Sequence, residues 1–364
     1  MCSRDAWCKI FGPCCTQTTS MSTQNQPQLQ GGGLHFSKSA KIKHSVLGQG
    51  AFGEIVDIGN DRVSKRFGSW YDMHRELKSM DAVAAAISGD AAKRAVFKRH
   101  TLILDKREVI DSDPTFSINY RLCRGARTLS DYLASLSRLG LDGERASRRP
   151  WVEKRIGDLE RSLRDRLFVD VAHAVLSVLS AMRPVCHCDV KPDNIMVCED
   201  GGAMAVKLID FGVASRKVCK GMTYQYHPSF FADGFANLDM CDAAKAVIGE
   251  MVYEGVDASN GSSHARQTNG CHDLYSLGIT LLTVTHDRAR PEFLAFAKQL
   301  IVNSHRTDID HGAMVSGALR ICSETLRPLA LPLTRGRKAS SLLSAPRVRE
   351  RDTRVRLATR NTRP

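Results

Sequence analysis

The sequence predicts an α+β protein in which a small, mainly antiparallel β lobe with one helix precedes a larger, mainly helical lobe. Three observations support this prediction. Residues 41–68 alternate short β-type runs with Gly and Asn-Asp turn residues. Residues 70–88 place apolar side chains at helical spacing. From Leu129 onward, long apolar helical patterns dominate the chain.

In the first lobe, strands are expected both before and after the helix along the chain. Residues 41–68 read as strand, Gly-rich turn, strand, turn and strand, and further strands are predicted at 101–104 and 116–122. The helix at 70–88 has four apolar positions that would face the core: Met73, Leu77, Met80 and Ala84.

The second lobe is expected to centre on a buried helix that leads directly into His187. Its apolar positions are Leu167, Val171, Val175, Val178 and Met182. The preceding stretch, 140–165, is dense in charged residues, which is typical of a surface helix or an insertion between packed helices. The other elements expected are strands at 195–197 and 206–209 and helices around 237–252, from Asp273, and through 291–327.

Composition points to an ordinary intracellular protein. The 364 residues allow one large or two small domains, and 43% hydrophobic with 25% charged residues is usual for globular proteins. No apolar run approaches the roughly 18 residues that a membrane span needs, and the N-terminus lacks the order of a secretory signal. We therefore expect the protein in the cytoplasm, the nucleus or both.

The twelve cysteines are scattered along the chain, which favours free thiols in a reducing compartment. The exception is a cluster near the N-terminus, formed by Cys2, Cys8, Cys14 and Cys15. It allows three interpretations: a metal site, palmitoylation near Cys14-Cys15, or unordered thiols. A metal site is the weakest of these, because no CxxC pair or His partner accompanies the cluster.

Both ends of the chain are predicted to be extensions. Residues 1–40 are rich in Cys, Gln, Thr and Ser and contain three consecutive glycines, so we expect a flexible segment. The end of the chain, 329–364, is basic: from Leu331 onward there are ten Arg or Lys and two acidic residues. A solvated, disordered tail is the favoured interpretation, and the alternatives are nuclear targeting, nucleic-acid binding or docking to acidic partners.

The strongest chemical signal is the stretch His187-Cys188-Asp189-Val190-Lys191-Pro192-Asp193-Asn194, followed sixteen residues later by Asp210-Phe211-Gly212. Phosphoryl transfer needs a carboxylate that orients the attacking hydroxyl and accepts its proton, the role predicted for Asp189. It also needs hard oxygen ligands for Mg²⁺, and these are predicted to be Asn194 and Asp210.

A Gly-rich hairpin lies upstream of these residues. Glycine lets bare backbone approach anionic oxygens, so the hairpin is predicted to cover the phosphates of a nucleotide. The pattern is weak by itself and gains weight from the motifs that follow it. The residues expected to bind the nucleotide here are Leu47, Gly48, Gln49, Gly50, Ala51, Phe52, Gly53 and Ile55.

Together these motifs resemble those of the eukaryotic-type Ser/Thr protein kinase superfamily. The resemblance implies a bilobal kinase fold that uses ATP and Mg²⁺ and acts on Ser or Thr of protein substrates. It also implies that Lys65 pairs with the α- and β-phosphates, that Glu76 holds Lys65, and that Val63 covers the adenine. Lys191 would neutralise the transferring phosphoryl group, and a lysine at this place resembles Ser/Thr rather than tyrosine kinases.

The resemblance covers about residues 44–320, and the expected kinase domain is 41–328, with a first lobe of about 41–124 and a second of about 125–328. Two departures stand out. Cys188 occupies the place of an Arg that often binds an activation-segment phosphate in the family, and the Ala-Pro-Glu that closes this segment is missing. An activation-loop phosphate switch is therefore not expected. These departures resemble the kinases of large DNA viruses, herpesviruses especially, which would place the protein in a host cell.

Two other functions stay open. One is small-molecule phosphotransfer, as in aminoglycoside- or choline-kinase-like proteins, although Lys191, Phe211-Gly212 and the full Gly-rich loop weigh against it. The other is a pseudokinase scaffold that uses the fold and the basic tail only for binding. The candidate active-site residues are all present, which weighs against the scaffold: Lys65, Glu76, Asp189, Asn194 and Asp210.

The basic tail contains Arg337-Lys338-Ala339-Ser340, which resembles a basophilic phosphorylation site. We expect Ser340 to be phosphorylated, by this protein or another, which would partly offset the charge of the tail. Phosphopeptide mapping that covers Ser340 repeatedly without finding the modification would contradict this expectation.

Overall fold

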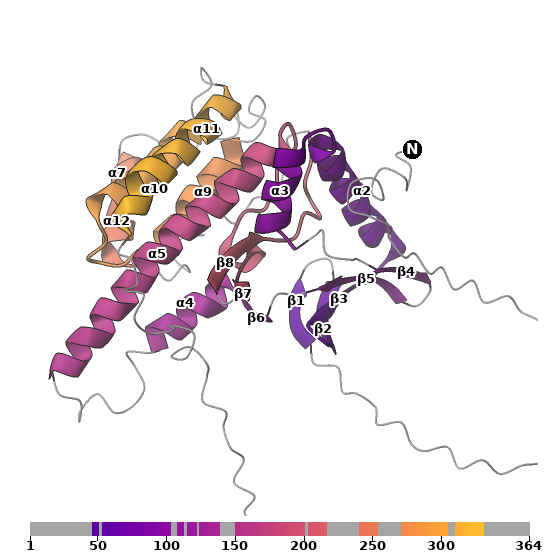
Figure 1. Cartoon of the computed structure of the whole chain (residues 1–364), viewed down its shortest axis with the longest axis horizontal. Helices are drawn as coiled ribbons and strands as arrows, with labels where there is room; N and C mark the ends of the chain where they lie inside the picture. The colour runs from indigo at the N-terminus through magenta and orange to yellow at the C-terminus, as the bar shows by residue number, and fades with distance from the viewer. Residues whose placement is uncertain are drawn as a thin grey trace, which may run out of the picture. The chain divides into compact units, whose positions relative to one another are not determined.

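The computed structural model describes residues 46–50, 53–102, 108–112, 115–121, 124–138, 150–200, 203–216, 240–253, 271–304 and 310–330. These residues confirm the mixed α+β architecture, with two antiparallel sheets and a set of helices (Figure 1). All of them belong to a unit that spans Met1–Leu331. The predicted extensions at 1–40 and 329–364 lie almost wholly outside the described residues, and the division into two lobes remains a prediction.

The first sheet is antiparallel throughout and follows the order β1-β2-β3-β5-β4. Its strands are β1 (Val46–Gly50), β2 (Gly53–Gly59), β3 (Arg62–Phe67), β4 (Glu108–Ser112) and β5 (Thr115–Arg121). The strands predicted within 41–68 and at 116–122 are therefore confirmed. Between β2 and β3 the turn residues Asn60 and Asp61 adopt positive φ angles, which short polar side chains tolerate best.

Helix α2 (Trp70–Ile87) forms where helical spacing predicted it. Ser69 caps its N-terminus by accepting a hydrogen bond from the amide of Asp72, which satisfies one of the donors that a helix start leaves unpaired. Three of the four predicted apolar positions are buried, and Leu77 is partly buried. Met73 packs in one cluster with Phe67 of β3 and Ile118 of β5, so the helix is attached to the sheet by its apolar face.

The prediction of a strand at 101–104 is wrong for residues 101 and 102, the part of this range that the structure describes. Helix α3 (Ala91–His100) occupies the preceding residues, and Thr101 makes only an isolated bridge to Leu208. The hydroxyl of Thr101 donates to the carbonyl of Phe97, which ends the helix. The error has a physical cause, because a short apolar run around a buried Leu102 fits a strand and a helix end equally well.

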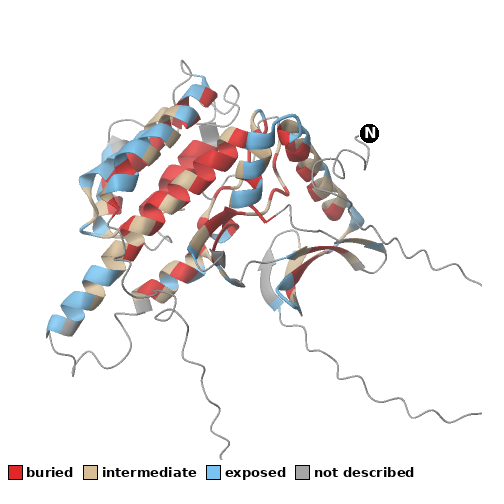
Figure 2. Cartoon of the chain, viewed as in Figure 1, coloured by how far each residue is buried: buried red, intermediate tan, exposed pale blue. Residues whose placement is uncertain are grey.

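The helical part is organised around α5 (Pro150–Met182). Its second half is buried at all five predicted positions, whereas its first half consists mostly of exposed and partly buried residues (Figure 2). The charged stretch at 140–165 thus includes a surface helix, as one of the two interpretations held, and it continues into the buried helix without a break. Helix α4 (Leu129–Arg138) precedes it.

A three-stranded sheet has the order β6-β7-β8, and its first strand precedes α4 and α5 in the chain whereas the other two follow them. Its strands are β6 (Arg124–Thr128), β7 (Ile195–Asp200) and β8 (Ala203–Leu208), which confirms the strands predicted at 195–197 and 206–209. A single turn, η2 (Pro192–Asn194), joins the motif after His187 to β7.

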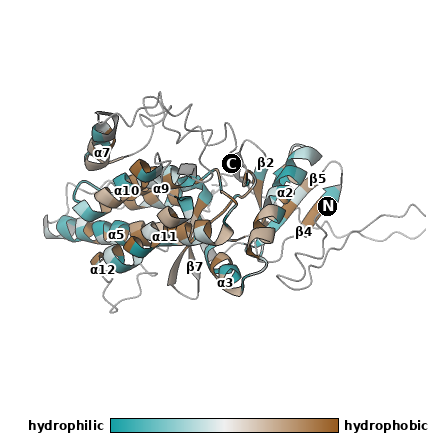
Figure 3. Ribbon diagram, turned by 90° about the horizontal axis from the view of Figure 1, so that it is seen from above, coloured by the Kyte–Doolittle hydropathy of each residue, from teal (hydrophilic) through white to brown (hydrophobic). Residues whose placement is uncertain are grey.

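The remaining helices are α7 (Asp242–Tyr253), α9 (Cys271–Val284), α10 (Pro291–Ser304), α11 (His311–Ile321), the π-helical turn η6 (Cys322–Leu326) and α12 (Arg327–Leu329). They match the helices predicted in these regions. Apolar residues on α9 and α10 form much of the core around α5 (Figure 3). Within the described part of the chain, no helix combines the length and apolarity that crossing a membrane requires.

The cysteines agree with the expectation of free thiols only in part. Cys186, Cys188, Cys241 and Cys322 carry reduced thiols. Cys198 on β7 is disulfide-bonded, which contradicts the expectation for this residue. The clustered cysteines near the N-terminus lie outside the described residues.

Gly278 of α9 tests the packing of this helix against α10. A Cβ at this position would lie 2.5 Å from Cγ1 of Ile301 and 2.9 Å from the carbonyl oxygen of Ala297. Gly278→Ala should therefore destabilise the fold by about 1–3 kcal/mol through overpacking. Gly249→Ala is the matched control, because nothing lies within 4 Å of the corresponding Cβ in α7. Urea unfolding measures both, and equal stability of the two variants would contradict the packing.

Candidate active site

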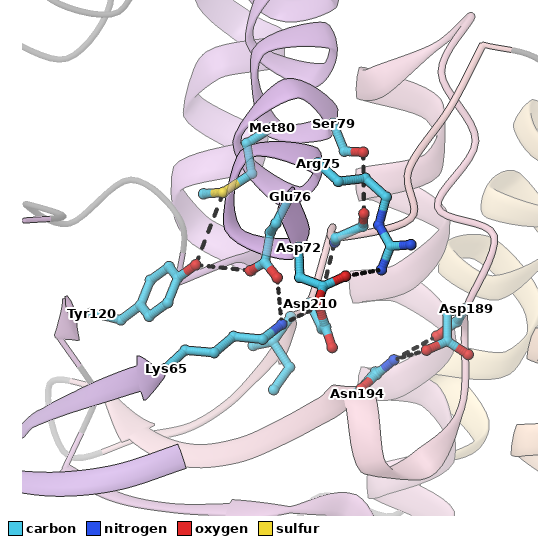
Figure 4. Close-up of polar contacts among 12 residues, drawn as sticks. Lys65, Asp72, Arg75, Glu76, Ser79, Met80, Tyr120, Asp189, Asn194 and Asp210 are labelled. Carbon is cyan, nitrogen blue, oxygen red and sulfur yellow. Dashed lines mark hydrogen bonds and ion pairs between the residues drawn. The ribbon is translucent and has the colours of Figure 1, made fainter. Parts of the chain in front are cut away.

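The centre of the site is the Lys65 ammonium, which extends from β3 between two carboxylates (Figure 4). Its Nζ lies 2.6 Å from Oε2 of Glu76 on α2. It also lies 2.9 Å from Oδ1 of Asp210, which follows β8. Residues from three separate parts of the chain therefore meet at one buried charge.

Burial and the charges of Lys65, Glu76 and Asp210 together set the pKa values of these three residues. The side chains of Lys65 and Glu76 are 10% and 6% exposed. Burial by itself would lower the pKa of Lys65, but the carboxylates of Asp210 and Glu76 outweigh it and raise that pKa above its usual range. Burial raises the pKa of Glu76, with partial compensation from Lys65. For Asp210 burial acts in the same direction, yet Lys65 prevails and the pKa is lowered.

Two further side chains hold this triad and were not found from the sequence. The hydroxyl of Tyr120 on β5 donates to Oε1 of Glu76 at 3.0 Å. The hydroxyl of Ser79 on α2 donates to the carbonyl of Gly212 at 3.2 Å (Figure 4). No motif marks either residue, although Tyr120 stands two positions from the strand centre Ile118 and so shares its face.

The second cluster of predicted residues lies on the loop around η2. Nδ2 of Asn194 donates to Oδ2 of Asp189 at 2.7 Å and to its backbone carbonyl at 2.9 Å. Nζ of Lys191 lies 2.9 Å from the same Oδ2. Asp189, the predicted proton acceptor, thus contacts both Lys191, predicted to neutralise the phosphoryl group, and Asn194, a predicted Mg²⁺ ligand. The carboxylate of Asp189 remains partly exposed.

The loop is supported from below by Asp273 at the start of α9. Its two carboxylate oxygens accept hydrogen bonds from the amides of His187 and Cys188, at 2.7 and 2.8 Å. Cys188 has φ +67°, a left-handed conformation that is uncommon for a residue with a side chain. The two hydrogen bonds that the buried carboxylate of Asp273 accepts compensate for this strained backbone conformation.

His187 packs beneath the loop. Its ring is fully buried and meets Phe211 edge-on, with the ring centroids 4.7 Å apart. Nε2 lies 3.0 Å from the carbonyl of Ile209, and Nδ1 accepts from the amide of Asp189. Phe211 in turn packs against Phe97 of α3, at 5.3 Å between centroids. The helix missed from the sequence therefore helps to place the segment that contains Asp210.

The Gly-rich hairpin is only partly described. Residues 47–50 lie in β1, Gly53 and Ile55 lie in β2, and Ala51 and Phe52 lie outside the described residues. Gly53 is required by the sheet itself, because a Cβ at this position would lie 2.0 Å from the carbonyl oxygen of Arg66. Phosphate approach is thus not needed to explain this glycine. Ile55 lies opposite Lys65 in the β2–β3 pair.

Val63 is buried on β3, directly opposite Tyr120 of β5. Its predicted role above the adenine stays a prediction. Asn194 and Asp210 offer the hard oxygen atoms that Mg²⁺ prefers. Both hydrogen bonds from the Asn194 side chain use its nitrogen, which leaves the amide oxygen as the atom for a cation. The donor set therefore fits Mg²⁺.

Comparisons with known proteins point in one direction. No protein-family model matches the chain. The LRR receptor-like serine/threonine-protein kinase EFR of Arabidopsis thaliana is 28% identical over 179 residues, which make up 48% of this chain and 15% of that protein. The mitogen-activated protein kinase kinase mkk2 of Aspergillus fumigatus is 25% identical over 219 residues, 60% of this chain and 33% of that protein.

The chain spans a third or less of the length of these two relatives. Both are protein kinases by name, so the chain has distant homology to Ser/Thr protein kinases. The mixed α+β structure, with small antiparallel sheets and a helical part, is compatible with a kinase-like fold. Together these findings support a kinase-type phosphotransferase.

The triad makes a pH-dependent prediction about stability. In Lys65→Met, Glu76 and Asp210 lose their shared cation, so the pKa of each folded-state carboxyl rises above its unfolded value. Such groups destabilise the fold as pH rises through their pKa, because the folded state then must give up protons it prefers to keep. We expect a loss of about 3–5 kcal/mol at pH 8 and a smaller loss at pH 5.

Urea unfolding at the two pH values measures this effect. The matched control is Lys298→Met, whose partner Glu250 lies 3.3 Å away and is largely exposed. Exposed pairs contribute about 0–1 kcal/mol, so this variant should lose little at either pH. A Lys65→Met loss that does not depend on pH would contradict the electrostatic account of the triad.

Proposed function

We propose that the protein is a Mg²⁺- and ATP-dependent serine/threonine protein kinase. The observation that carries this proposal is the convergence of Lys65, Glu76 and Asp210 beside a loop on which Lys191 and Asn194 both contact Asp189. A buried cation next to partly exposed carboxylates suits a triphosphate with its metal ion. The distant homology to named protein kinases supports the same assignment.

Each residue has a defined task in this proposal. Asp189 accepts the proton of the substrate hydroxyl, and its hydrogen bond from Asn194 directs the carboxylate. Lys191, in contact with Asp189, offsets negative charge on the phosphoryl group as it passes to the hydroxyl oxygen. Lys65 binds the phosphates of ATP that are not transferred.

Asn194 and Asp210 would hold the Mg²⁺. When bound, the ion supplies positive charge that neutralises the phosphate oxygens. Glu76 keeps Lys65 in place when ATP is absent and orients it when ATP is bound. Leu47, Val63 and Ile55, with the Gly-rich hairpin, would enclose the nucleotide.

Control of this kinase would not rely on an activation-loop phosphate. Cys188 is buried and has no positive charge with which to bind such a phosphate. The residues around the missing Ala-Pro-Glu lie outside the described part of the chain. Relation to viral kinases, acidic or nucleic-acid partners of the tail, and a cytoplasmic or nuclear location remain predictions from the sequence.

Phosphate transfer from radiolabelled ATP, with Mg²⁺ and a general Ser/Thr protein substrate, tests the proposal. We expect Asp189→Asn to lower kcat by about 100-fold or more, since it removes the proton acceptor. Lys65→Met and Asp210→Ala should likewise abolish most transfer. Lys298→Met should transfer at the wild-type rate, because Lys298 lies on α10 and its ion-pair partner Glu250 is a surface residue.

The outcomes separate the alternatives. Transfer to protein that survives Lys65→Met and Asp210→Ala would overturn the site assignment. Transfer only to an aminoglycoside or an amino alcohol would favour a small-molecule phosphotransferase. ATP binding without transfer to either class of acceptor would favour a pseudokinase scaffold.

A further inference from the structure

The two oxygen atoms of Glu76 have different partners. Oε2 lies 2.6 Å from the ammonium of Lys65, and Oε1 accepts the hydroxyl proton of Tyr120 at 3.0 Å. A carboxylate held at both oxygens has one orientation, whereas a carboxylate held at one oxygen can rotate about its terminal torsion. The position of Lys65 therefore depends on a residue that lies outside every motif of the chain.

The hydroxyl of Tyr120 also lies 3.9 Å from the sulfur of Met80, which is a weak acceptor at a long distance. A hydrogen bond to an ionised, buried carboxylate is among the strong ones, so the proton goes to Glu76. The ring of Tyr120 packs on the cluster around Met73 and Ile118, and a phenylalanine would fill that space equally well.

The first sheet fixes the position of Tyr120 relative to Lys65. Tyr120 lies directly opposite Val63, and Ile118 lies directly opposite Lys65, in the same antiparallel β3–β5 pair. Side chains two residues apart on a strand share a face, so Tyr120 and Lys65 reach Glu76 from one rigid surface. Helix α2 is thus fixed to the sheet by two polar contacts through a single carboxylate (Figure 4).

We propose that Tyr120 is a positioning residue that holds Glu76 so that Lys65 stays aligned for the nucleotide phosphates without a phosphorylated segment. This inference rests on the proposed kinase function and adds a means of regulation to it. Ser79, three residues after Glu76 on the same face of α2, donates to the carbonyl of Gly212 and so attaches the helix to the segment that follows Asp210. The helix is then held in the competent position by contacts within the folded chain.

The hydrogen bond has a consequence for pH. Burial and the nearby charge of Asp210 raise the pKa of Glu76, while the contacts with Lys65 and Tyr120 act to lower it. Removal of the Tyr120 hydroxyl therefore raises that pKa further. A protonated Glu76 does not hold the ammonium of Lys65. As pH falls, a variant without the Tyr120 hydroxyl should therefore lose activity at a higher pH than the wild type does.

Tyr120→Phe tests the inference in the full chain. Loss of one hydrogen bond to a charged group corresponds to about a tenfold change, so we expect kcat to fall about tenfold. KM for ATP should change less than about twofold if the lost contact acts in the transition state. The acid limb of the kcat profile should move to higher pH. Tyr132→Phe is the matched control, since that hydroxyl faces the sulfur of Met204 at 3.9 Å.

A double-mutant cycle shows whether Tyr120 acts through Glu76. In a Glu76→Ala background, Tyr120→Phe should have no further effect on kcat. A Tyr120→Phe variant that matches wild type in kcat and pH profile would overturn the inference. An equal loss in both backgrounds would overturn it too, because the tyrosine would then act on packing alone.

The same cycle separates this inference from the kinase assignment. If the wild-type protein transfers no phosphate, the proposed function fails, and the cycle is then measured by urea unfolding at pH 8. Non-additive losses for Tyr120→Phe and Glu76→Ala would support the coupling of the two residues, and additive losses would overturn it.

Discussion

The buried ammonium of Lys65 is the interaction on which the rest of the site depends. A lysine withdrawn from water is costly unless opposite charges and hydrogen bonds surround it. Here the compensation comes from Glu76 on α2 and Asp210 after β8, so neither carboxylate is placed without the lysine. The dependence is mutual, because burial also raises the pKa of Glu76 and opposes its charge. The first sheet, α2 and the segment after β8 therefore require one another.

A second constraint supports the loop around η2, which carries Asp189, Lys191 and Asn194. Asp273 binds the amides of His187 and Cys188, and this allows a backbone turn that a residue with a side chain rarely adopts. The ring of His187 then contacts Phe211, which leads back to Asp210 and the lysine. The carboxylate of Asp189 and the ammonium of Lys65 are thus linked through packed side chains and hydrogen bonds.

The structure also indicates which contacts hold α2 and Lys65 in place. The place where a phosphate-binding arginine is usual in the resembled family holds Cys188, whose side chain is buried. The contacts that fix α2 come instead from Tyr120 and Ser79, both within the folded chain. Constitutive alignment of Lys65 is consistent with that arrangement. The chain thus combines a motif pattern that resembles that of Ser/Thr kinases with contacts from Tyr120 and Ser79 that fix α2.

The sequence by itself predicted the candidate site residues and determined most of the local elements. Asp189, Lys191, Asn194 and Asp210 stand at fixed short spacings, and the helices and strands around them follow local periodicity. Only the tertiary structure decided α3, the disulfide of Cys198 and the reason for Gly53. It also decided the role of Tyr120, which lies 44 residues from Glu76. Such contacts join residues distant in the chain, and neither spacing nor propensity records which side chains meet once the sheet and helices pack.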